Sequence, residues 1–258
     1  MINNKIQGLN FLKKYAPNIG YKVSNYTLIQ KRRYKLKKDF ELQRIKRKFK
    51  KLIIIRSSAN DEDNFRKTNA GKYLSKVSDT KNLIILKNNI ELVLKKLKDN
   101  DYIIIQDYVK DVDIAGVIFT RDHNNGGPYY IINYDNSGKT NLITSGHKNP
   151  LIKTSIIHHS LNHKPKKFNL LIKYIKKIIV KLKNDKLDIE FAIKKNKIYF
   201  FQIRHLNIKT KKLDKEINNA LFNFRKKLKK IFNSSKINRT STILSNMVDW
   251  NPAEMIGK

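Results

Sequence analysis

The chain has 258 residues, enough to bury a sizeable core as one large domain or as two lobes. It contains no cysteine, which excludes disulfides and thiolate metal sites. Its N-terminus lacks the apolar core of a signal peptide, and no apolar stretch approaches the roughly 18 residues that cross a membrane. We therefore expect a soluble, cytoplasmic protein without a membrane partner.

The net charge of +35 has two interpretations. Such a charge gives strong non-specific attraction to nucleic acid. However, only 10 of the 56 basic residues are arginine, and lysine is spread over nearly every segment. A nucleic-acid surface usually concentrates arginine and aromatic residues in one patch. We interpret the charge as compositional drift, and keep a non-catalytic basic nucleic-acid-binding module as the alternative function.

Hydrophobic periodicity predicts helices and strands in mixed order along the chain. The expected helices cover residues 5–16, 34–50, 90–97, 170–182 and 214–232. The expected strands cover residues 52–55, 102–109, 116–120, 129–134, 187–193 and 198–203. Because strands and helices do not alternate as regular βαβ units, the order favours the α+β class.

A buried strand, Leu52 to Ile55, runs directly into Arg56, Ser57 and Ser58. A guanidinium fork, hydroxyl groups and backbone N–H groups all suit phosphate oxygens. In a chain rich in lysine, an arginine at this place indicates a need for its planar geometry. Gly71 would allow close backbone approach. A simple arginine–aspartate pair in a loop is the plainer explanation.

The segment Leu187–Leu206 is expected to form a hairpin with polar residues on one face. A three-residue loop, 195–197, opposes Glu190 to Gln202 and Asp188 to Arg204 while keeping the other face apolar. Carboxylate and amide oxygens suit Mg²⁺, and an adjacent arginine suits phosphate. An exposed polar face with a surface ion pair remains an equal alternative at this point.

Two other motifs are weaker. The segment 136–140, NSGKT, ends like a P-loop, but the required glycine five positions before Gly138 is Asn133, so a polar turn is expected. His159 and His163 have the spacing of metal ligands on a helix, but no third ligand is evident. We interpret them as structural or surface histidines.

Three segments together resemble one known family. The segments IIIRSSANDEDNFRKTNAGKY, AGVIFTRD and LDIEFAI…IYFFQIR, in this order over residues 50–206, resemble motifs of the ATP-binding domain of phosphoenolpyruvate synthase, pyruvate phosphate dikinase and rifampicin phosphotransferase. The N-terminal KIQGLNFLKKY is similar to the family segment that carries its nucleotide-binding lysine, which matches Lys5. The family glycines around that lysine are Asn3, Asn4 and Ile6 here, and His123 replaces the proline after FTRD.

The resemblance implies an ATP-grasp fold, in which two α+β lobes hold Mg-ATP between them. It assigns Arg56, Ser57, Arg121 and Lys5 to ATP binding. It also assigns Glu190 and Gln202 to the metal ion and the phosphates, with Arg204 beside them. Arg56 and Arg204 would be the catalytic residues.

The implied activity is that of an ATP-dependent, dikinase-like kinase or phosphotransferase with ATP and Mg²⁺ as cofactors. We expect a nucleotide-binding domain over residues 1–208, and a C-terminal helix and tail over 209–258 that leads to a following domain. In the family, a phosphohistidine domain and a pyruvate-binding domain complete the enzyme. Such a domain or chain is the expected partner, without which the chain is expected to be incomplete.

Overall fold

The computed structural model describes residues 2, 4–59, 74–138, 152–160, 165–208 and 215–234. The chain divides into two units, residues 1–211 and 212–258. The second unit contains helix α6 (Lys215–Ser234), close to the helix expected over 214–232. The domain boundary after residue 208 stays a prediction. Among the described residues, no helix has both the length and the apolar character needed to span a membrane.

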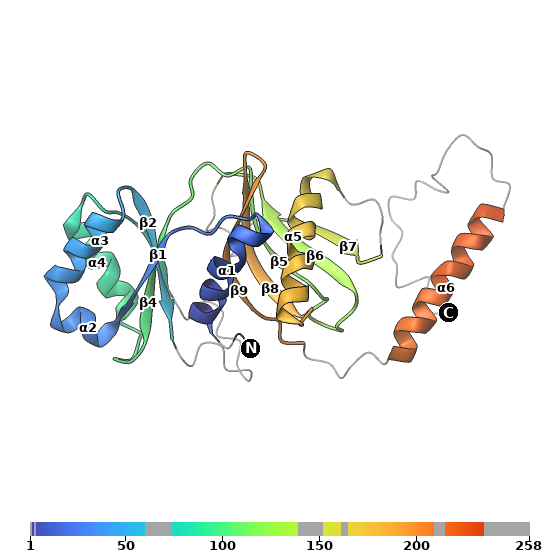
Figure 1. The fold of residues 1–258 in the computed structure, drawn as a ribbon, viewed down its shortest axis with the longest axis horizontal. Helices are drawn as coiled ribbons and strands as arrows, with labels where there is room; N and C mark the ends of the chain where they lie inside the picture. Colours follow the sequence, from blue (N-terminus) through green and yellow to red (C-terminus); the bar gives the residue numbers. More distant parts are fainter. Residues whose placement is uncertain are drawn as a thin grey trace. The chain divides into compact units, whose positions relative to one another are not determined.

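The first lobe of this unit is built on an antiparallel four-stranded sheet in the order β1-β4-β2-β3. Helices lie on one face of this sheet (Figure 1). Isoleucines at alternate positions of β1, β2 and β4 pack there against apolar residues of the helices, and each fully buried isoleucine stabilises the fold by roughly 1.5–3 kcal/mol. The elements are β1 (Tyr26–Gln30), α2 (Lys31–Leu36), α3 (Lys38–Lys48), β2 (Leu52–Ser58), β3 (Ser75–Asp79), α4 (Leu83–Leu94) and β4 (Tyr102–Asp107).

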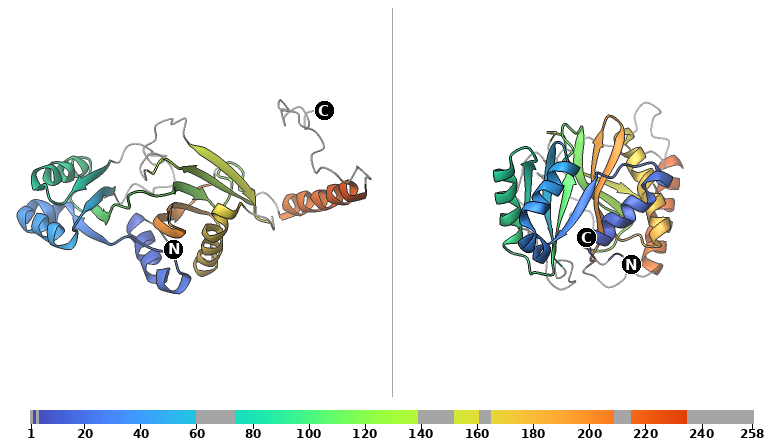
Figure 2. Two further views of the ribbon diagram at one scale, coloured as in Figure 1. Left: turned by 90° about the horizontal axis from the view of Figure 1, so that it is seen from above. Right: turned by 60° about the vertical axis from the view of Figure 1, so that its left-hand side comes forward.

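The second lobe is an antiparallel five-stranded sheet in the order β7-β6-β5-β8-β9. Two helices, one from each end of the first unit's sequence, lie on the same side of this sheet (Figure 2). Both contribute to one apolar core with the sheet. The elements are α1 (Lys5–Ile19), β5 (Ile114–Phe119), β6 (Tyr129–Asp135), β7 (Lys153–His158), α5 (Lys166–Leu182), β8 (Leu187–Lys194) and β9 (Lys197–His205).

The β8–β9 hairpin has the predicted pairing but not the predicted loop. Glu190 pairs with Gln202, and Asp188 with Arg204. The expected three-residue loop is wrong, because Lys194 pairs with Lys197 and only two residues lie between them. Both loop residues, Lys195 and Asn196, have positive φ, which is typical of a tight hairpin turn.

A β-bulge in this hairpin reconciles the two-residue loop with the predicted pairing. The register shifts between Glu190 and Phe191, so one extra residue of β9 is accommodated there. Phe201 and Gln202 consequently lie on the same face of the sheet. Phe201 packs with Ala192, while Phe200 and Ile203 remain in the core under the helices.

The predicted α+β class with two lobes is confirmed, since each lobe is an antiparallel sheet with helices packed on it. Three short strands, β1, β3 and β7, were not predicted. Helix α4 begins at Leu83, whereas the helical spacing predicted a start at residue 90. The earlier start is explained by Asn82, which caps the helix by accepting a hydrogen bond from the backbone N–H of Ile85.

Candidate functional site

Each sheet has an apolar face under its helices and a second face that carries polar side chains. In β2, Ile53 and Ile55 belong to the helix-covered core, so alternation places Arg56 on the opposite face. In β8, Ile189 belongs to the other core, and Glu190 lies on the opposite face in the same way. The polar faces of the two sheets therefore carry Arg56 and Glu190, two of the residues that the sequence singled out.

Arg56 and Glu190 form an ion pair that links the two sheets. The Nη1 atom of Arg56 donates to Oε2 of Glu190 at 2.6 Å, and the two side chains are 10% and 15% exposed. Burial acts to raise the pKa of the Glu190 carboxyl, but the charge and hydrogen bond of Arg56 outweigh it, so this pKa is lowered. A charge-assisted hydrogen bond, largely shielded from solvent, thus joins two residues that are 134 positions apart in the sequence.

The guanidinium of Arg56 is only partly used by this pair. Its Nε atom is buried and has no hydrogen-bond acceptor among the residues that the structure describes. A buried N–H group without an acceptor is destabilising by about 1–3 kcal/mol. An oxygen-rich ligand at this place would remove that penalty.

Lys5 lies at the same site. It is the first residue of α1, and its Nζ atom donates to the carbonyl oxygen of Ser57 at 3.3 Å. The charge of Lys5 also contributes to the lowered pKa of Glu190, after the larger effects of burial and Arg56. The structure therefore brings Lys5, Arg56, Ser57 and Glu190 together, although they come from three separate segments of the first unit.

The start of α1 is held by a side-chain cap. The Asn4 side chain caps the helix by accepting a hydrogen bond from the backbone N–H of Gln7 at 2.9 Å. One turn later, Gly8 lies against β9, where a Cβ atom would come within 2.2 Å of the carbonyl oxygen of Ile203. Gly8 thus lets α1 approach β9, and it is a residue that the sequence reasoning missed. A glycine inside a helical pattern was the available signal.

Gln202 and Arg204 lie on the polar face of the second sheet. Gln202 is buried and directly opposite Glu190. The Nε atom of Arg204 donates to Oδ2 of Asp188 at 2.8 Å, and Asp188 is itself buried. Asp188 was seen in the pattern but not assigned to the site, and the structure shows that it orients Arg204.

The oxygens of Glu190 and Gln202 fit a Mg²⁺ ion only in part. Mg²⁺ in nucleotide sites is usually held by one or two protein carboxylates together with phosphate oxygens and water. Within the described ranges, no group of three or more acidic, histidine or cysteine side chains could hold a metal ion by itself. A carboxylate beside an amide oxygen therefore suits a Mg²⁺ ion that arrives with phosphates, and does not suit a resident metal ion.

Arg121 has a local partner. Its Nε atom donates to Oδ2 of Asp185 at 3.0 Å, Nη2 bonds the same oxygen, and Nη1 donates to the carbonyl of Gly126. None of these bonds involves Arg56 or Glu190. The assignment of Arg121 to the triphosphate stays a prediction.

Gln106 is a second residue that the sequence reasoning missed. It pairs with Ile54 across β4 and β2, and therefore lies on the same sheet face as Arg56. Both polar atoms of its amide are buried without a partner in the described part of the chain. The signal was a glutamine directly after the apolar run of β4, which the sequence reasoning treated only as part of the strand over residues 102–109.

The histidine interpretation gains support where the structure describes it. The His159 ring packs against Tyr130, and its Nε2 atom bonds the backbone carbonyl of Thr120 at 2.9 Å. Burial, followed by the charge of Arg121, lowers the pKa of His159 to about 4. His163 and Gly71 lie outside the described residues.

The P-loop-like segment begins as a polar turn. The carboxylate of Asp135 accepts a hydrogen bond from the backbone N–H of Ser137, and Gly138 has a positive φ. Lys139 and Thr140 lie outside the described residues.

No family model and no curated protein matches the chain. Solved structures with a similar backbone include D-alanine–D-alanine ligase from Helicobacter pylori, at 15% identity and a TM-score of 0.44 over 80% of this chain and 54% of that one. Carboxyaminoimidazole ribonucleotide synthase from Aspergillus clavatus, complexed with ATP, is 11% identical, with a TM-score of 0.39 over 78% of this chain and 44% of that one. This chain thus spans about half the length of these two structures.

A third structure, ACD1 from Ca. Korarchaeum cryptofilum in complex with coenzyme A, is 13% identical, with a TM-score of 0.45 over 79% of this chain and 92% of that one. The three have different names, and two of them hold different bound molecules, ATP and coenzyme A. Similarities of this size do not assign an activity to the chain.

Proposed function

We propose that the chain binds Mg-ATP between the polar faces of its two sheets and acts in phosphoryl transfer. The observation that carries the proposal is the buried Arg56 guanidinium, which holds a carboxylate with one nitrogen and leaves Nε without an acceptor. Phosphate oxygens in the plane of the fork would satisfy both nitrogens at once. An amine could not do so, which gives a reason for arginine in a chain dominated by lysine.

The charges around this pair suit a triphosphate. Lys5, Arg56 and Arg204 supply three positive charges near the two carboxylates of Glu190 and Asp188. A Mg²⁺ ion bound with the nucleotide would neutralise phosphate charge and would be held by Glu190 and Gln202. The contribution of the chain is then to position the phosphates and stabilise charge, which is the main protein contribution to phosphoryl transfer.

The finer assignment, a domain of the phosphoenolpyruvate synthase type with an ATP-grasp fold, rests on the three sequence motifs. Residues of the first and third motif, Arg56 and Glu190, are in direct contact, as a shared nucleotide site requires. In the resembled family, the phosphoryl group passes to a histidine on another domain. We therefore propose a cytoplasmic, dikinase-like protein whose acceptor is supplied by a separate domain or chain.

Calorimetric titration with Mg-ATP tests the binding site. We expect Arg56→Ala to weaken binding by about 2–5 kcal/mol, the range for a desolvated charged contact. Arg56→Lys should also weaken it, although the charge is kept, because a point charge cannot replace two parallel donors. Arg33→Lys is the matched control, and it should change the affinity much less, since Arg33 is paired with Glu41 on the helices of the first lobe.

Wild-type affinity in folded Arg56→Lys and Arg56→Ala would remove Arg56 from the site. A salt titration with random RNA addresses the alternative function. Non-specific nucleic-acid binding would fall steeply with salt and would be insensitive to Arg56→Lys.

The acceptor is tested with ATP labelled at the γ- or β-phosphate. We expect this chain alone to bind ATP without accumulating phosphohistidine and without forming phosphoenolpyruvate from pyruvate, because transfer needs a nucleophile in line with the phosphate and none of the six histidines lies in a sequence that resembles the family's phosphohistidine segment. His205, next to Arg204, bonds the Asn184 side chain through Nδ1, and its Nε2 is buried. Stable label on this chain alone would show an internal acceptor.

A further inference from the structure

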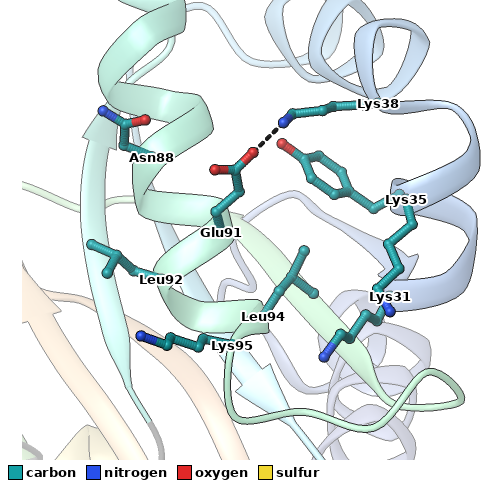
Figure 3. Close-up of a pocket in the computed structure, with 9 residues that line it drawn as sticks. Lys31, Lys35, Lys38, Asn88, Glu91, Leu92, Leu94 and Lys95 are labelled. Carbon is teal, nitrogen blue, oxygen red and sulfur yellow. Dashed lines mark ion pairs between the residues drawn. The ribbon is translucent and has the colours of Figure 1, made fainter.

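A pocket of about 690 Å³ lies on the helical side of the first lobe (Figure 3). Its walls come from α2 and the start of α3 on one side, and from α4 on the other. The lining residues are Lys31, Tyr34, Lys35, Lys38, Asn88, Glu91, Leu92, Leu94 and Lys95. Tyr34 and Leu94 belong to the core on the helix-covered face of the sheet, whereas Arg56 lies on the other face. The sheet therefore separates this pocket from the proposed nucleotide site.

Lysines alone would indicate nothing here, because lysine lies on nearly every surface of this chain. The informative residue is Tyr34, whose side chain is buried and lines the pocket. Its hydroxyl group has no hydrogen-bond partner among the described residues. Buried tyrosine hydroxyls usually find a partner, and an unmade bond destabilises the fold by about 1–3 kcal/mol. A ligand with an acceptor atom would supply the missing partner.

The charges of the pocket are arranged unevenly. At one end, Glu91 and Lys38 form an ion pair and neutralise each other. At the other end, Lys31 and Lys95 lie on opposite walls with Leu94 between them (Figure 3). Lys31 donates to the carbonyl oxygen of Leu97, and Asp99 pairs with Lys35 and also interacts with the charge of Lys31. With one carboxylate against Lys31, Lys35 and Lys95, this end keeps a net positive charge beside apolar surface.

We propose that this pocket is a second ligand site, which binds a small amphipathic carboxylate with an apolar or aromatic body. The carboxylate would lie between Lys31 and Lys95, and the apolar body would cover Leu94 and the half-exposed Leu92. An acceptor atom of the ligand would take the hydrogen bond of the Tyr34 hydroxyl. The volume is within the roughly 300–1,000 Å³ of small-molecule sites.

Three probes that share one body test the charge preference: 4-phenylbutyrate, 4-phenylbutan-1-ol and 4-phenylbutan-1-amine. Titrations followed by the amide resonances of α2 and α4 give the dissociation constants. We expect the carboxylate to bind at least about tenfold more tightly than the amine, with the alcohol between them. Equal affinities for the carboxylate and the amine, or no binding of the carboxylate, would overturn the proposal.

Variants locate the binding. Lys95→Glu should weaken 4-phenylbutyrate binding by about fivefold. Lys176→Glu, an exposed position on α5 in the other lobe, makes the same charge change and should leave the affinity within about twofold. Equal effects of the two variants would mean non-specific attraction to a basic surface, and would overturn the proposal.

Tyr34→Phe separates a ligand role from a structural one. Because the hydroxyl has no partner among the described residues, its removal should leave the melting temperature unchanged or higher. Binding of 4-(4-hydroxyphenyl)butyrate, which carries a second acceptor atom at its apolar end, should fall by about fivefold, while binding of 4-phenylbutyrate should stay unchanged. A lower melting temperature with unchanged binding would assign the hydroxyl to the fold and contradict its role as a ligand donor. Saturating Mg-ATP should not displace the probe. Displacement would show one shared site instead of two.

Discussion

Two arginine–carboxylate pairs at strand ends differ in burial and in the distance along the chain that they span. Arg56 joins β2 to Glu190 in the other sheet, and the two side chains are 10% and 15% exposed. Arg121 follows β5 and binds Asp185, with side chains 23% and 41% exposed. The second pair is accompanied by the Thr120 hydroxyl, which donates to the backbone carbonyl of Asp185. It therefore ties two neighbouring loops of one lobe together.

The difference shows that two arginines in similar sequence positions need different physical explanations for the contacts they make. The bonds of Arg121 go to Asp185 and Gly126, groups of its own lobe, so a structural explanation is sufficient. The pair formed by Arg56 is less easily explained by stability. Buried ion pairs are often no more stabilising than apolar residues of the same shape, and Arg56 also leaves one donor unused. Retaining such a pair is reasonable where a ligand uses it.

The largest expected effect is on the free energy of unfolding when one partner of the buried pair is removed. Glu190→Gln should destabilise the ligand-free chain by about 3 kcal/mol, because the charge of Arg56 is left largely buried without its carboxylate. Asp185→Asn should have an effect of about 1 kcal/mol or less, because solvent screens that pair. Urea titrations of both variants measure the difference.

A double-mutant cycle sharpens this result. The coupling between Arg56 and Glu190 should exceed that between Arg121 and Asp185 by at least about 1 kcal/mol. Similar couplings would mean that burial does not distinguish the two pairs. Mg-ATP should restore part of the stability lost in Glu190→Gln if phosphate replaces the carboxylate as the partner of Arg56.

The next largest effect concerns magnesium. Gln202→Leu removes an amide oxygen beside Glu190 and keeps a buried side chain of similar length, so it should weaken ATP binding about tenfold at low Mg²⁺. The loss should shrink as the Mg²⁺ concentration rises. Asp185→Asn is the control and should leave the Mg²⁺ dependence unchanged. A loss of affinity that persists equally in EDTA would assign Gln202 to the nucleotide instead of the metal ion.

The sequence could predict those features of the fold that depend on the periodicity of apolar residues. The alternation of β8 and β9 predicted that Glu190 faces Gln202, since any other pairing would mix apolar and polar faces. It could not predict the bulge at Phe201, because a two-residue loop with a bulge and a three-residue loop give the same pairing near Glu190. The short strands β1, β3 and β7 were not predicted because their sequences lack a clear apolar–polar alternation, and they gain their place by pairing with neighbouring strands.

The residue types of the site were predictable from the sequence, but the contacts between its residues were not. The character of Arg56 as a phosphate ligand follows from guanidinium geometry, but its contact with Glu190 joins two sheets and has no local signal. The same holds for Gly8. The carbonyl oxygen of Ile203, which is far away in sequence, leaves no room for a side chain at this position. Long-range contacts of this kind depend on the fold and cannot be read from spacing.

The two regions should also differ in the pH range where they lose stability. Next to Arg121, the pKa of His159 is about 4 in the folded chain against 6.5 for an ordinary histidine. Its neutral form is favoured by folding, so stability is complete above pH 6.5 and is lost as the pH falls toward 4. We expect a loss of about 1 kcal/mol, allowing for solvent screening at a half-buried ring. Urea titrations of wild type and His159→Gln across this range measure it.

The region around Arg56 should lose stability at lower pH than the region around His159. The Glu190 pKa is lowered from its ordinary value of 4.5, so the stability from its ionised form is present above that value and is lost as the pH falls below it. The difference in stability between wild type and Glu190→Gln should therefore be constant above about pH 5.5 and shrink only in acid. A difference that shrinks between pH 7 and 5.5 would contradict the assignment of the lowered pKa to Glu190.

The smallest effect is expected for substitutions in the turn of the hairpin that carries Glu190 and Gln202. Such substitutions change the connection between β8 and β9 but do not alter either arginine pair. Lys195 and Asn196 have φ values of 48° and 59°, a conformation that glycine adopts without strain. Asn196→Gly should stabilise the chain by about 0.5 kcal/mol, and Asn196→Val should destabilise it by more, because a β-branched residue is strained at positive φ. ATP affinity should stay within about twofold in both variants, since the bulge separates the turn from Glu190. If Asn196→Val instead lowered the coupling between Arg56 and Glu190, the bulge would not isolate the site, and the register of the whole hairpin would be set from its turn.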